Sequence, residues 1–587
     1  MVIEPNGENK VKILTNIKEI FDQEENIGVI GSPSSTNELA VDILGTAVNK
    51  GLVGKFSIFN YYQDGKDHYA LGQITEIMMQ NIWTQDPTMR GIIRQRGRVD
   101  PITEKQDIHT AKMIVSSVFS IGNDSVDPSI FGTVPSTGTR IKLLEAKILD
   151  CLLLDYKEEL FQLGKIYGTE IFLPIWLKHF DRGKFGLGEA YHIGIFGKTG
   201  SGKSVLAKMM ITGYARHKNM SIFILDPQGE FSLEFSSNKL LKSIFEKKIG
   251  RKIKILNLQN LVFDFSESFL MDLLNASGFF HRLRMPFEDH WPRFTEETIK
   301  LLKGGKGTVD EEIKPWNYYK KESFKRLWYQ IPKDVFLNKI IFTERPRERV
   351  KEVWKSLNFD EMYFIWASIT KLFSYKSDEN VRLSKLLKET SEGKPLVIID
   401  ISSQGKTGEL FWNDQIQLIA IEQFLGRIAI QAENRFKDGG NLNSLVVVDE
   451  AHRLAPRGKP ENNTVGRIKS IFIDAVRTTR KFGLGWMFIS QSLSSLDREI
   501  INQIRIYIFG FGLGWGVERQ ALKEIIGGAK EAIRLYQMFK DPQSGLGKIE
   551  FPFMTIGPIS PLSFSGTPLF FNALNYPDQF YKLNFEK

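Results

Sequence analysis

A glycine-rich loop that ends in a lysine and a serine lies about a third of the way along the chain. In the stretch IGIFGKTGSGKS (residues 193–204), Gly197, Gly202, Lys203 and Ser204 match the spacing G-x-x-x-x-G-K-[ST]. Glycines let the backbone curl so that successive N–H groups point at phosphates, and a following helix adds its positive N-terminal end. The lysine would reach the β and γ phosphates of a nucleotide, and the serine hydroxyl would contact Mg²⁺.

The surroundings of this loop support a nucleotide site. The apolar run IGIF precedes it and the helical pattern KSVLAKMMITGYARHK follows it, which is the context that such a loop requires. A glycine-rich turn without a ligand is the alternative. We predict that the loop binds ATP with Mg²⁺. The residues assigned to ATP are Gly197, Thr199, Gly200, Ser201, Gly202, Lys203, Ser204 and Val205.

An acidic pair follows a second apolar run. The stretch SLVVVDEAHRL ends its β-type run in Asp449 and Glu450. Asp449 suits the role of holding the Mg²⁺ shell, as in P-loop enzymes generally. Glu450 would orient or deprotonate the attacking water. The pair therefore predicts hydrolysis in addition to binding; an acidic pair at a strand end without catalysis is the alternative.

Further polar residues stand where other predicted strands end. Asp226 and Glu230 lie in ILDPQGEF, and Ser490 and Gln491 lie in FISQS. Strand carboxyl ends face the ligand crevice of an open α/β sheet, so these side chains are candidates for the same site. For the two acids, a metal or water contact and ordinary turn chemistry are both open. The Gln491 amide could sense the γ-phosphate or position the water.

Two arginines, Arg477 and Arg480, occur in RTTRKFGLG at the end of a predicted helix. An arginine here could be a finger that reaches the phosphates bound by a neighbouring subunit. The local pattern fits a solvated helix end equally well, because the helix dipole favours arginine there.

The elements that would position these residues alternate along the chain. From about residue 190, near-continuous apolar runs such as SIFILD, PLVIIDI and SLVVVDE alternate with helical patterns. Such runs are typical of parallel strands buried on both faces. The alternation predicts an α/β domain formed by residues 186–255 and 391–560.

Other regions depart from this pattern. Residues 1–185 contain short apolar-aromatic runs broken by turn residues, which predict a small β-barrel or sandwich. Residues 256–390 show helical spacing of apolar groups and predict a helical insertion. Residues 561–587 form a predicted C-terminal extension. Core packing is expected for the tryptophans of the insertion, with base stacking as the alternative. They are Trp291, Trp316, Trp328, Trp354 and Trp366.

Bulk composition indicates a protein without membrane segments. The 587 residues carry a formal charge of +9, which on so long a chain is a mild hint of a polyanionic partner. The N-terminus has no apolar signal core, and the longest apolar run is shorter than the ~20 residues of a membrane helix. Cys151 is the single cysteine, so no intrachain disulfide is possible, and a buried inert thiol is expected. These features predict a soluble, cytoplasmic protein.

The combination of motifs resembles the HerA family of hexameric DNA-translocating ATPases, within the HerA–FtsK group of P-loop NTPases. The motifs that carry the resemblance are GIFGKTGSGKS, LDPQGEF, LVIIDIS, VVVDEAHRLAP and RKFGLGWMFISQ. The resemblance implies a RecA-like P-loop ATPase core, a small barrel before it, a homohexameric ring with ATP sites at subunit boundaries, and DNA in the central channel. It also implies that Arg480 is a finger acting in trans.

The local patterns and the resemblance together assign roles to the candidate residues. The predicted catalytic residues are Lys203, Glu450, Arg480 and Gln491, and the predicted Mg²⁺ ligands are Ser204 and Asp449. Two features depart from the family pattern. Phe231 stands in DPQGEF where the family usually has tyrosine, and the tail after about residue 560 has no match that we can place.

The resemblance also implies a partner. Archaeal family members act with the nuclease NurA in DNA end resection, and bacterial ones are often paired with a sirtuin-like or nuclease effector in phage defence. This chain has no recognisable nuclease or NAD chemistry, so such an activity would come from a partner docked on the barrel end. Two functions remain open: an ATP-driven DNA translocase or helicase, and an ATPase scaffold that assembles and regulates an effector.

Basic residues offer candidate DNA contacts, because Lys and Arg in channel loops hold backbone phosphates. A solvated basic loop is the alternative for each of them. The loop candidates are Arg453, Arg457, Lys459, Arg467 and Lys469. A second basic cluster, KKIGRKIK (Lys247 to Lys254), could contact DNA or form a solvated strand edge.

Overall fold

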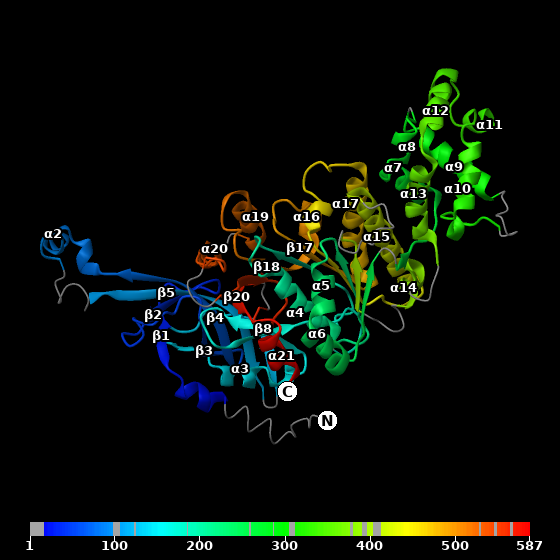
Figure 1. The fold of residues 1–587 in the computed structure, drawn as a ribbon. Coiled ribbons are helices and arrows are strands. Elements are labelled where there is room, and N and C mark those ends of the chain that lie inside the picture. The colour runs from blue at the N-terminus through cyan, green and yellow to red at the C-terminus, as the bar shows by residue number, and fades with distance from the viewer. Residues whose placement is uncertain are drawn as a thin grey trace.

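Three regions make up the fold in the computed structural model (Figure 1). A barrel with a projecting arm lies at one end, a large sheet covered by helices lies in the middle, and a helical lobe projects from the other end. The described residues are 17–97, 106–122, 125–184, 186–257, 260–285, 287–303, 312–375, 380–389, 396–402, 413–527, 530–544, 549–563 and 567–586.

The N-terminal region is a small antiparallel barrel. Its strands follow the order β2-β1-β7-β3-β4-β5, and pairing of β2 with β5 closes the sheet on itself. A seventh strand, β6, pairs with the outside edge of β5. The predicted barrel is therefore confirmed. Its elements are β1 (Asn26–Ile30), β2 (Leu39–Ile43), β3 (Phe56–Gln63), β4 (Lys66–Gln80), β5 (Ile108–Ile121), β6 (Val126–Ser129) and β7 (Arg140–Leu143).

Strands β4 and β5 run past the barrel as a two-stranded arm, which ends in η1 (Ile82–Gln85) and α2 (Pro87–Arg96) (Figure 1). Their pairing continues to Gln80 opposite Ile108. Large apolar side chains are exposed along this arm rather than buried. They are Met78, Met79, Ile82, Trp83 and Ile108.

The central sheet has eleven strands in the order β12-β15-β11-β16-β17-β10-β18-β19-β20-β8-β9. The seven strands from β12 to β18 are parallel to one another, and the remaining four are antiparallel. The strands are β8 (Leu160–Ile166), β9 (Phe172–Trp176), β10 (His192–Phe196), β11 (Ser221–Asp226), β12 (Ile253–Asn257), β15 (Leu396–Asp400), β16 (Ser444–Val448), β17 (Leu484–Ser490), β18 (Ile504–Gly510), β19 (Pro552–Ile556) and β20 (Leu569–Ala573).

Apolar side chains on both faces explain why the parallel strands read as continuous apolar runs. In β11, Ile222 and Ile224 pack in one core with helix α4, whereas Phe223 and Leu225 pack in the other core with α15 and α17. The helices of this region are α4 (Lys203–Ala215), α5 (Glu230–Ser237), α6 (Lys239–Ser243), η4 (Ile244–Ile249), α15 (Asp414–Lys437), α16 (Ala451–Leu454), α17 (Asn463–Thr478), η8 (Thr479–Phe482), α18 (Arg498–Gln503), α19 (Gly516–Ile526) and α20 (Lys530–Gln537).

The central sheet extends beyond the limits that the sequence predicted for it. Strands β8 and β9 fall within the predicted barrel region 1–185 but pair with β20 and with each other in the central sheet. Strand β20 and helix α21 (Asp578–Phe585) fall within the predicted extension 561–587, and α21 packs through Phe580 against Phe161 of β8. The tail is thus structural, because it supplies the strand that joins β19 to β8.

The helical lobe lies in the chain between β12 and β15, where an insertion was predicted. Trp366 is fully buried and donates a hydrogen bond from Nε1 to the Tyr318 carbonyl (2.7 Å), and Trp354 is also buried. Packing is therefore confirmed for these two, whereas Trp316 is exposed. The lobe contains β13 (Leu261–Val262), α7 (Glu267–Ala276), α8 (Phe279–Arg282), α9 (His290–Lys303), η5 (Pro315–Asn317), α10 (Lys321–Gln330), α11 (Asp334–Leu337), α12 (Glu344–Ser356), α13 (Phe359–Thr370), η6 (Lys371–Phe373), β14 (Val381–Arg382) and α14 (Leu383–Glu389).

Between the barrel and the central sheet, the chain forms α3 (Ala146–Leu152) and η3 (Leu154–Tyr156). Cys151 lies in α3, where partial burial raises the pKa of its thiol. A raised pKa keeps the thiol protonated and unreactive. Separately, none of the helices in the described part of the chain combines the length and apolar character that a membrane crossing requires.

Candidate nucleotide-binding site

The glycine-rich loop connects the carboxyl end of β10 to the first turn of α4. Gly200 and Gly202 have positive φ angles of 82° and 87°, a conformation that favours glycine. A Cβ at Gly202 would lie 2.8 Å from the Phe551 ring, and a Cβ at Gly200 would lie 2.2 Å from Nε2 of Gln543. The backbone conformation therefore favours glycine at both positions, and the Phe551 ring leaves little room for a side chain at Gly202. The strand–loop–helix context confirms the arrangement on which the phosphate-loop prediction rested.

Lys203 is held over the loop that it follows. Its Nζ donates a hydrogen bond to the Lys198 carbonyl at 3.1 Å, and the residue is buried. Burial lowers the pKa of Lys203, and the nearby carboxylates of Glu450 and Asp449 oppose that shift. A buried ammonium group on this loop is suited to a polyanionic ligand.

Ser204 contacts one of the two acids in ILDPQGEF. Its Oγ donates to Glu230 Oε2 at 3.2 Å, and Lys208 donates to the other oxygen of Glu230 at 3.2 Å. Asp226 instead accepts hydrogen bonds from the backbone N–H and the hydroxyl of Ser232, at 2.7 and 2.6 Å. Of the two possibilities left open for these acids, turn chemistry describes Asp226, whereas Glu230 faces the loop.

The predicted acidic pair follows β16, beside the loop. Burial, followed by the charge of Glu450, raises the pKa of Asp449 to about 7. Asp449 Oδ1 accepts a hydrogen bond from the Glu450 backbone N–H at 3.0 Å. Glu450 itself has a φ of 50°, a conformation that a non-glycine residue adopts uncommonly. Crowded carboxylates of this kind are stabilised by a cation.

Gln491 links the acidic pair to the glycine-rich loop. Its Nε2 donates to Glu450 Oε1 at 2.7 Å, and its Oε1 accepts from the Thr199 hydroxyl at 3.2 Å. His452, which sequence reasoning did not assign, places Nδ1 3.3 Å from Glu450 Oε2 and 3.2 Å from the Ser490 hydroxyl. Burial lowers the pKa of His452. The sequence signal was its position two residues after Glu450.

These groups surround a cavity of about 640 Å³, which is within the usual range for small-molecule sites. Six of the eight residues assigned to ATP line it; of the other two, Ser201 is buried and Gly197 begins the loop after β10. A second group of lining residues comes from a segment that sequence reasoning missed, since no motif marks it. These residues are Pro542, Gln543, Ile549 and Phe551.

The residues present fit a nucleotide with Mg²⁺. Oxygen donors of the type that Mg²⁺ prefers come from Ser204 and Asp449, both on the cavity wall. No group of three or more His, Cys, Asp or Glu side chains within the described ranges could hold a metal unaided. Mg²⁺ in nucleotide sites is bound by one or two protein groups together with substrate phosphates, so this donor set is sufficient.

Arg480 lies at the opposite end of the sheet from the loop. It precedes β17, whereas the loop follows β10, and these two strands are parallel neighbours. The seven residues of β17 span about 23 Å at ~3.3 Å per residue. Arg480 Nε lies 3.3 Å from Glu189 Oε2, and both side chains are 56% exposed. Arg477 forms an ion pair with Glu499. Neither arginine is placed at the loop of its own chain.

The candidate DNA-contact residues divide into two groups. Arg467 forms ion pairs with Glu422 and Asp272, at 2.6 and 3.1 Å, and Lys469 pairs with Asp497 at 2.8 Å. These two side chains hold the fold together and are not free for phosphate. The exposed members of the set are Arg453, Arg457 and Lys459.

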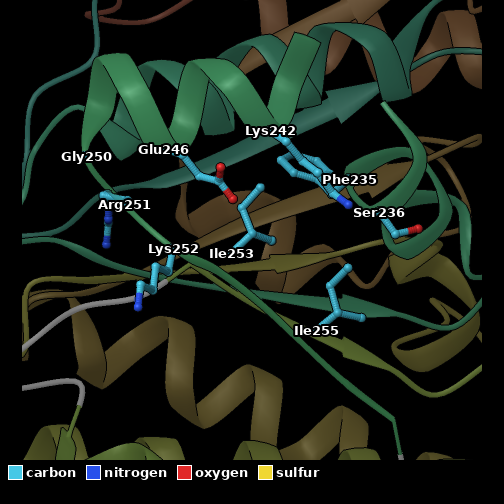
Figure 2. A pocket seen from close by; sticks show the side chains of 9 residues that line it. All are labelled: Phe235, Ser236, Lys242, Glu246, Gly250, Arg251, Lys252, Ile253 and Ile255. Carbon is cyan, nitrogen blue, oxygen red and sulfur yellow. The ribbon is translucent and has the colours of Figure 1, made fainter. Parts of the chain in front are cut away.

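The second basic cluster borders a hollow beside β12, at the edge of the sheet (Figure 2). Arg251 is buried there and donates to the carbonyls of Ala215 and Met220, at 3.1 and 2.6 Å. Burial lowers its pKa to about 10. Arg251 therefore stabilises the end of α4, while Lys247, Lys248 and Lys252 are exposed.

A parallel sheet with a phosphate loop after one strand and an acidic pair after a nearby strand defines a P-loop ATPase of RecA-like fold. Residues 190–412 match the family model described as "Helicase HerA, central domain". This part of the chain is therefore similar to the central domain of HerA helicases.

A curated relative is the DNA double-strand break repair helicase HerA of Sulfurisphaera tokodaii. It is 25% identical over 378 residues, which make up 63% of this chain and 62% of the relative, so the match spans less than two thirds of the relative's length.

Several solved structures are also similar. VirB4 of Thermoanaerobacter pseudethanolicus has 14% identity and a TM-score of 0.39, covering 71% of this chain and 97% of that one. The genome packaging NTPase B204 of Sulfolobus turreted icosahedral virus 2, in complex with AMPPCP, has 10% identity and a TM-score of 0.27, covering 66% and 98%.

Proposed function

We propose that this chain hydrolyses ATP with Mg²⁺ and uses the energy to move DNA. The observation that carries the proposal is the cavity that brings Lys203, Asp449, Glu450 and Gln491 to the glycine-rich loop. Lys203 binds the β and γ phosphates, and Ser204 and Asp449 hold Mg²⁺, which neutralises phosphate charge when bound. Glu450 accepts a proton from the attacking water.

Gln491 positions the catalytic acid in this proposal. Because its amide contacts both Thr199 and Glu450, a change in the loop is transmitted to Glu450 through a single side chain. An amide at this place also suits contact with the γ-phosphate. In this proposal, nucleotide binding at the glycine-rich loop changes the position of the Glu450 carboxylate through Gln491.

We propose a homohexameric ring, and the position of Arg480 supports a site shared between subunits. Its exposed side chain lies about one strand length from the loop of its own chain, so its catalytic role requires the site of a neighbouring subunit. A ring places each arginine at the next subunit's ATP and encloses a channel for DNA. In this proposal the ring moves DNA in the cytoplasm and acts in DNA end processing or in phage defence.

Exposed basic residues after the acidic pair are the proposed DNA contacts, and DNA stimulation of ATP turnover tests the function. Replacing Arg453, Arg457 and Lys459 together by glutamine should remove most of the stimulation by DNA and leave turnover without DNA unchanged. The affinity for duplex DNA should also depend less steeply on salt. The magnitude of the slope of log affinity against log salt should fall by about 0.9 for each of the three side chains that binds a phosphate.

A matched control for that experiment is the glutamine triple variant of Lys247, Lys248 and Lys252, which removes the same charge from the exposed second cluster. It should keep both the stimulation and the salt slope. An equal loss in the two variants would contradict a special role of the loop, since either net charge or the second cluster would then contribute as much to DNA binding. ATP turnover that is indifferent to DNA of every form would favour the scaffold function.

The exposed apolar arm of the barrel favours an effector partner in addition to the motor role. Exposed apolar patches on soluble domains commonly mark protein interfaces. The arm is tied to the ATPase region at its base, where Arg534 of α20 pairs with Glu76 of β4. A nuclease or sirtuin-like effector bound at the arm would thus contact an element that is linked to the core.

Removing the arm's apolar side chains should release the effector. In the native host, the Ile82→Ala, Trp83→Ala double variant should lose the protein that co-purifies stoichiometrically with the unmodified chain, while ATP turnover is retained. The Trp316→Ala, Phe342→Ala double variant, which removes exposed aromatic rings from the helical lobe, serves as the control. Retention of the partner by the arm variant would contradict docking at the arm.

A further inference from the structure

The segment between α20 and β19 forms a wall of the cavity beside the glycine-rich loop. Pro542, Gln543, Ile549 and Phe551 contribute to it. None of them belongs to the phosphate-binding or acidic motifs. They reach the site only because β19 pairs with β18, the strand next to β10 in the sheet.

Phe551 is packed directly on the phosphate loop. Its ring atoms would lie 2.8 and 2.9 Å from a Cβ at Gly202, so the ring covers the backbone of that glycine. The Gln543 amide nitrogen would lie 2.2 Å from a Cβ at Gly200. The wall therefore lies within reach of a molecule whose phosphates are held by this loop.

Both polar and apolar side chains line the cavity. Glu230, Asp449, Glu450 and Gln491 supply polar groups suited to metal, water and phosphate. The apolar lining comes from Val205 of α4 together with Pro542, Ile549 and Phe551.

Ile549 is 57% exposed at this wall, although a large apolar side chain gains free energy from burial. A flat aromatic base placed against Ile549 and Phe551 would cover this apolar surface. Aromatic rings bind bases by stacking, without reading the base edge.

We propose that Ile549 and Phe551 form the base-binding wall, against which the purine base of a nucleoside triphosphate packs. This inference rests on the proposed nucleotide site. With the triphosphate on the glycine-rich loop, the base packs against these two apolar side chains of the cavity lining. Because Ile549 and Phe551 lack hydrogen-bonding groups, their contact with the base does not distinguish adenine from guanine.

Calorimetric titration with ATP, GTP and inorganic tripolyphosphate separates the wall from the phosphate loop. Phe551→Ala should weaken ATP and GTP binding by about 10-fold or more, as for loss of base stacking. Ile549→Ala should weaken both by a smaller factor. Tripolyphosphate has no base, so its affinity should stay within about twofold in both variants. Phe551→Tyr, which keeps the ring, should retain the affinity for ATP.

The matched control is Ile430→Ala on α15, which truncates a similarly exposed isoleucine outside the cavity. Unchanged ATP affinity in Ile549→Ala and Phe551→Ala would overturn the proposal that these side chains bind the base. Equal losses for ATP and tripolyphosphate would also overturn it, since Phe551 would then act by shaping the loop. A loss confined to ATP would contradict base-independent stacking. If the unmodified chain bound neither ATP nor tripolyphosphate, the nucleotide site itself would be wrong.

Discussion

ATP turnover is expected to fall by about 10²–10⁴-fold in Glu450→Gln, while the variant still binds ATP. Glutamine has nearly the shape of glutamate and its side-chain oxygen can still accept the 2.7 Å hydrogen bond from Gln491, so the site keeps its geometry. The neutral amide cannot accept a proton from water. Steady-state phosphate release measures turnover, and calorimetric titration measures ATP affinity.

Two further variants define what this result means. Lys203→Ala should weaken ATP binding itself, because it removes the ammonium group that the loop holds at 3.1 Å from the Lys198 carbonyl. Glu461→Gln removes an exposed acid that does not line the cavity and should leave turnover unchanged. Turnover at the unmodified rate in Glu450→Gln would show that another group activates the water.

Arg480→Ala is expected to lose about 10³–10⁵-fold in the rate of hydrolysis, the range of arginine fingers supplied in trans. The side chain is exposed at the end of the sheet remote from the loop of its own chain, so its removal should not disturb folding or ATP binding. Arg477→Ala is the matched control, because it removes a second exposed arginine at the same end. This control should keep most of the activity.

Mixing subunits tests whether Arg480 acts across an interface. Arg480→Ala and Lys203→Ala subunits should each be nearly inactive alone. In mixed rings, some interfaces combine an intact loop with an intact arginine, so activity should return in part over a range of mixing ratios. Rings that form but stay inactive at every ratio would contradict complementation between neighbours. Full activity of Arg480→Ala alone would exclude the finger.

Local sequence patterns were sufficient to predict those features that depend on residues adjacent in the chain. The glycine-rich loop and the acidic pair were recognisable because turn chemistry and side-chain function depend on a few adjacent residues. Apolar runs such as SIFILD, now β11, predicted buried parallel strands because both faces must be covered. Since parallel strands end at one edge, the meeting of Lys203 with Glu450 was also predictable.

Patterns of this kind could not specify which distant segments pair. Strands β8, β9 and β20 have no local signal that assigns them to the central sheet, so the predicted limits at residues 185 and 561 divide elements that the sheet joins. The sequence also does not show which basic side chains form ion pairs with carboxylates in the folded chain. Arg467 and Arg453 look alike in a basic loop, but only Arg467 faces the carboxylates of Glu422 and Asp272.

The phosphate loop, the acidic pair and the alternation of strands and helices could be predicted from the sequence, because each depends on residues close together in the chain. The folded chain was needed to show that Gln491 connects Thr199 to Glu450, that Phe551 covers Gly202, and that Arg480 lies remote from its own loop. These relations depend on the order of strands in the sheet. Strand order is set by packing and pairing summed over the whole chain, and no short segment carries that information.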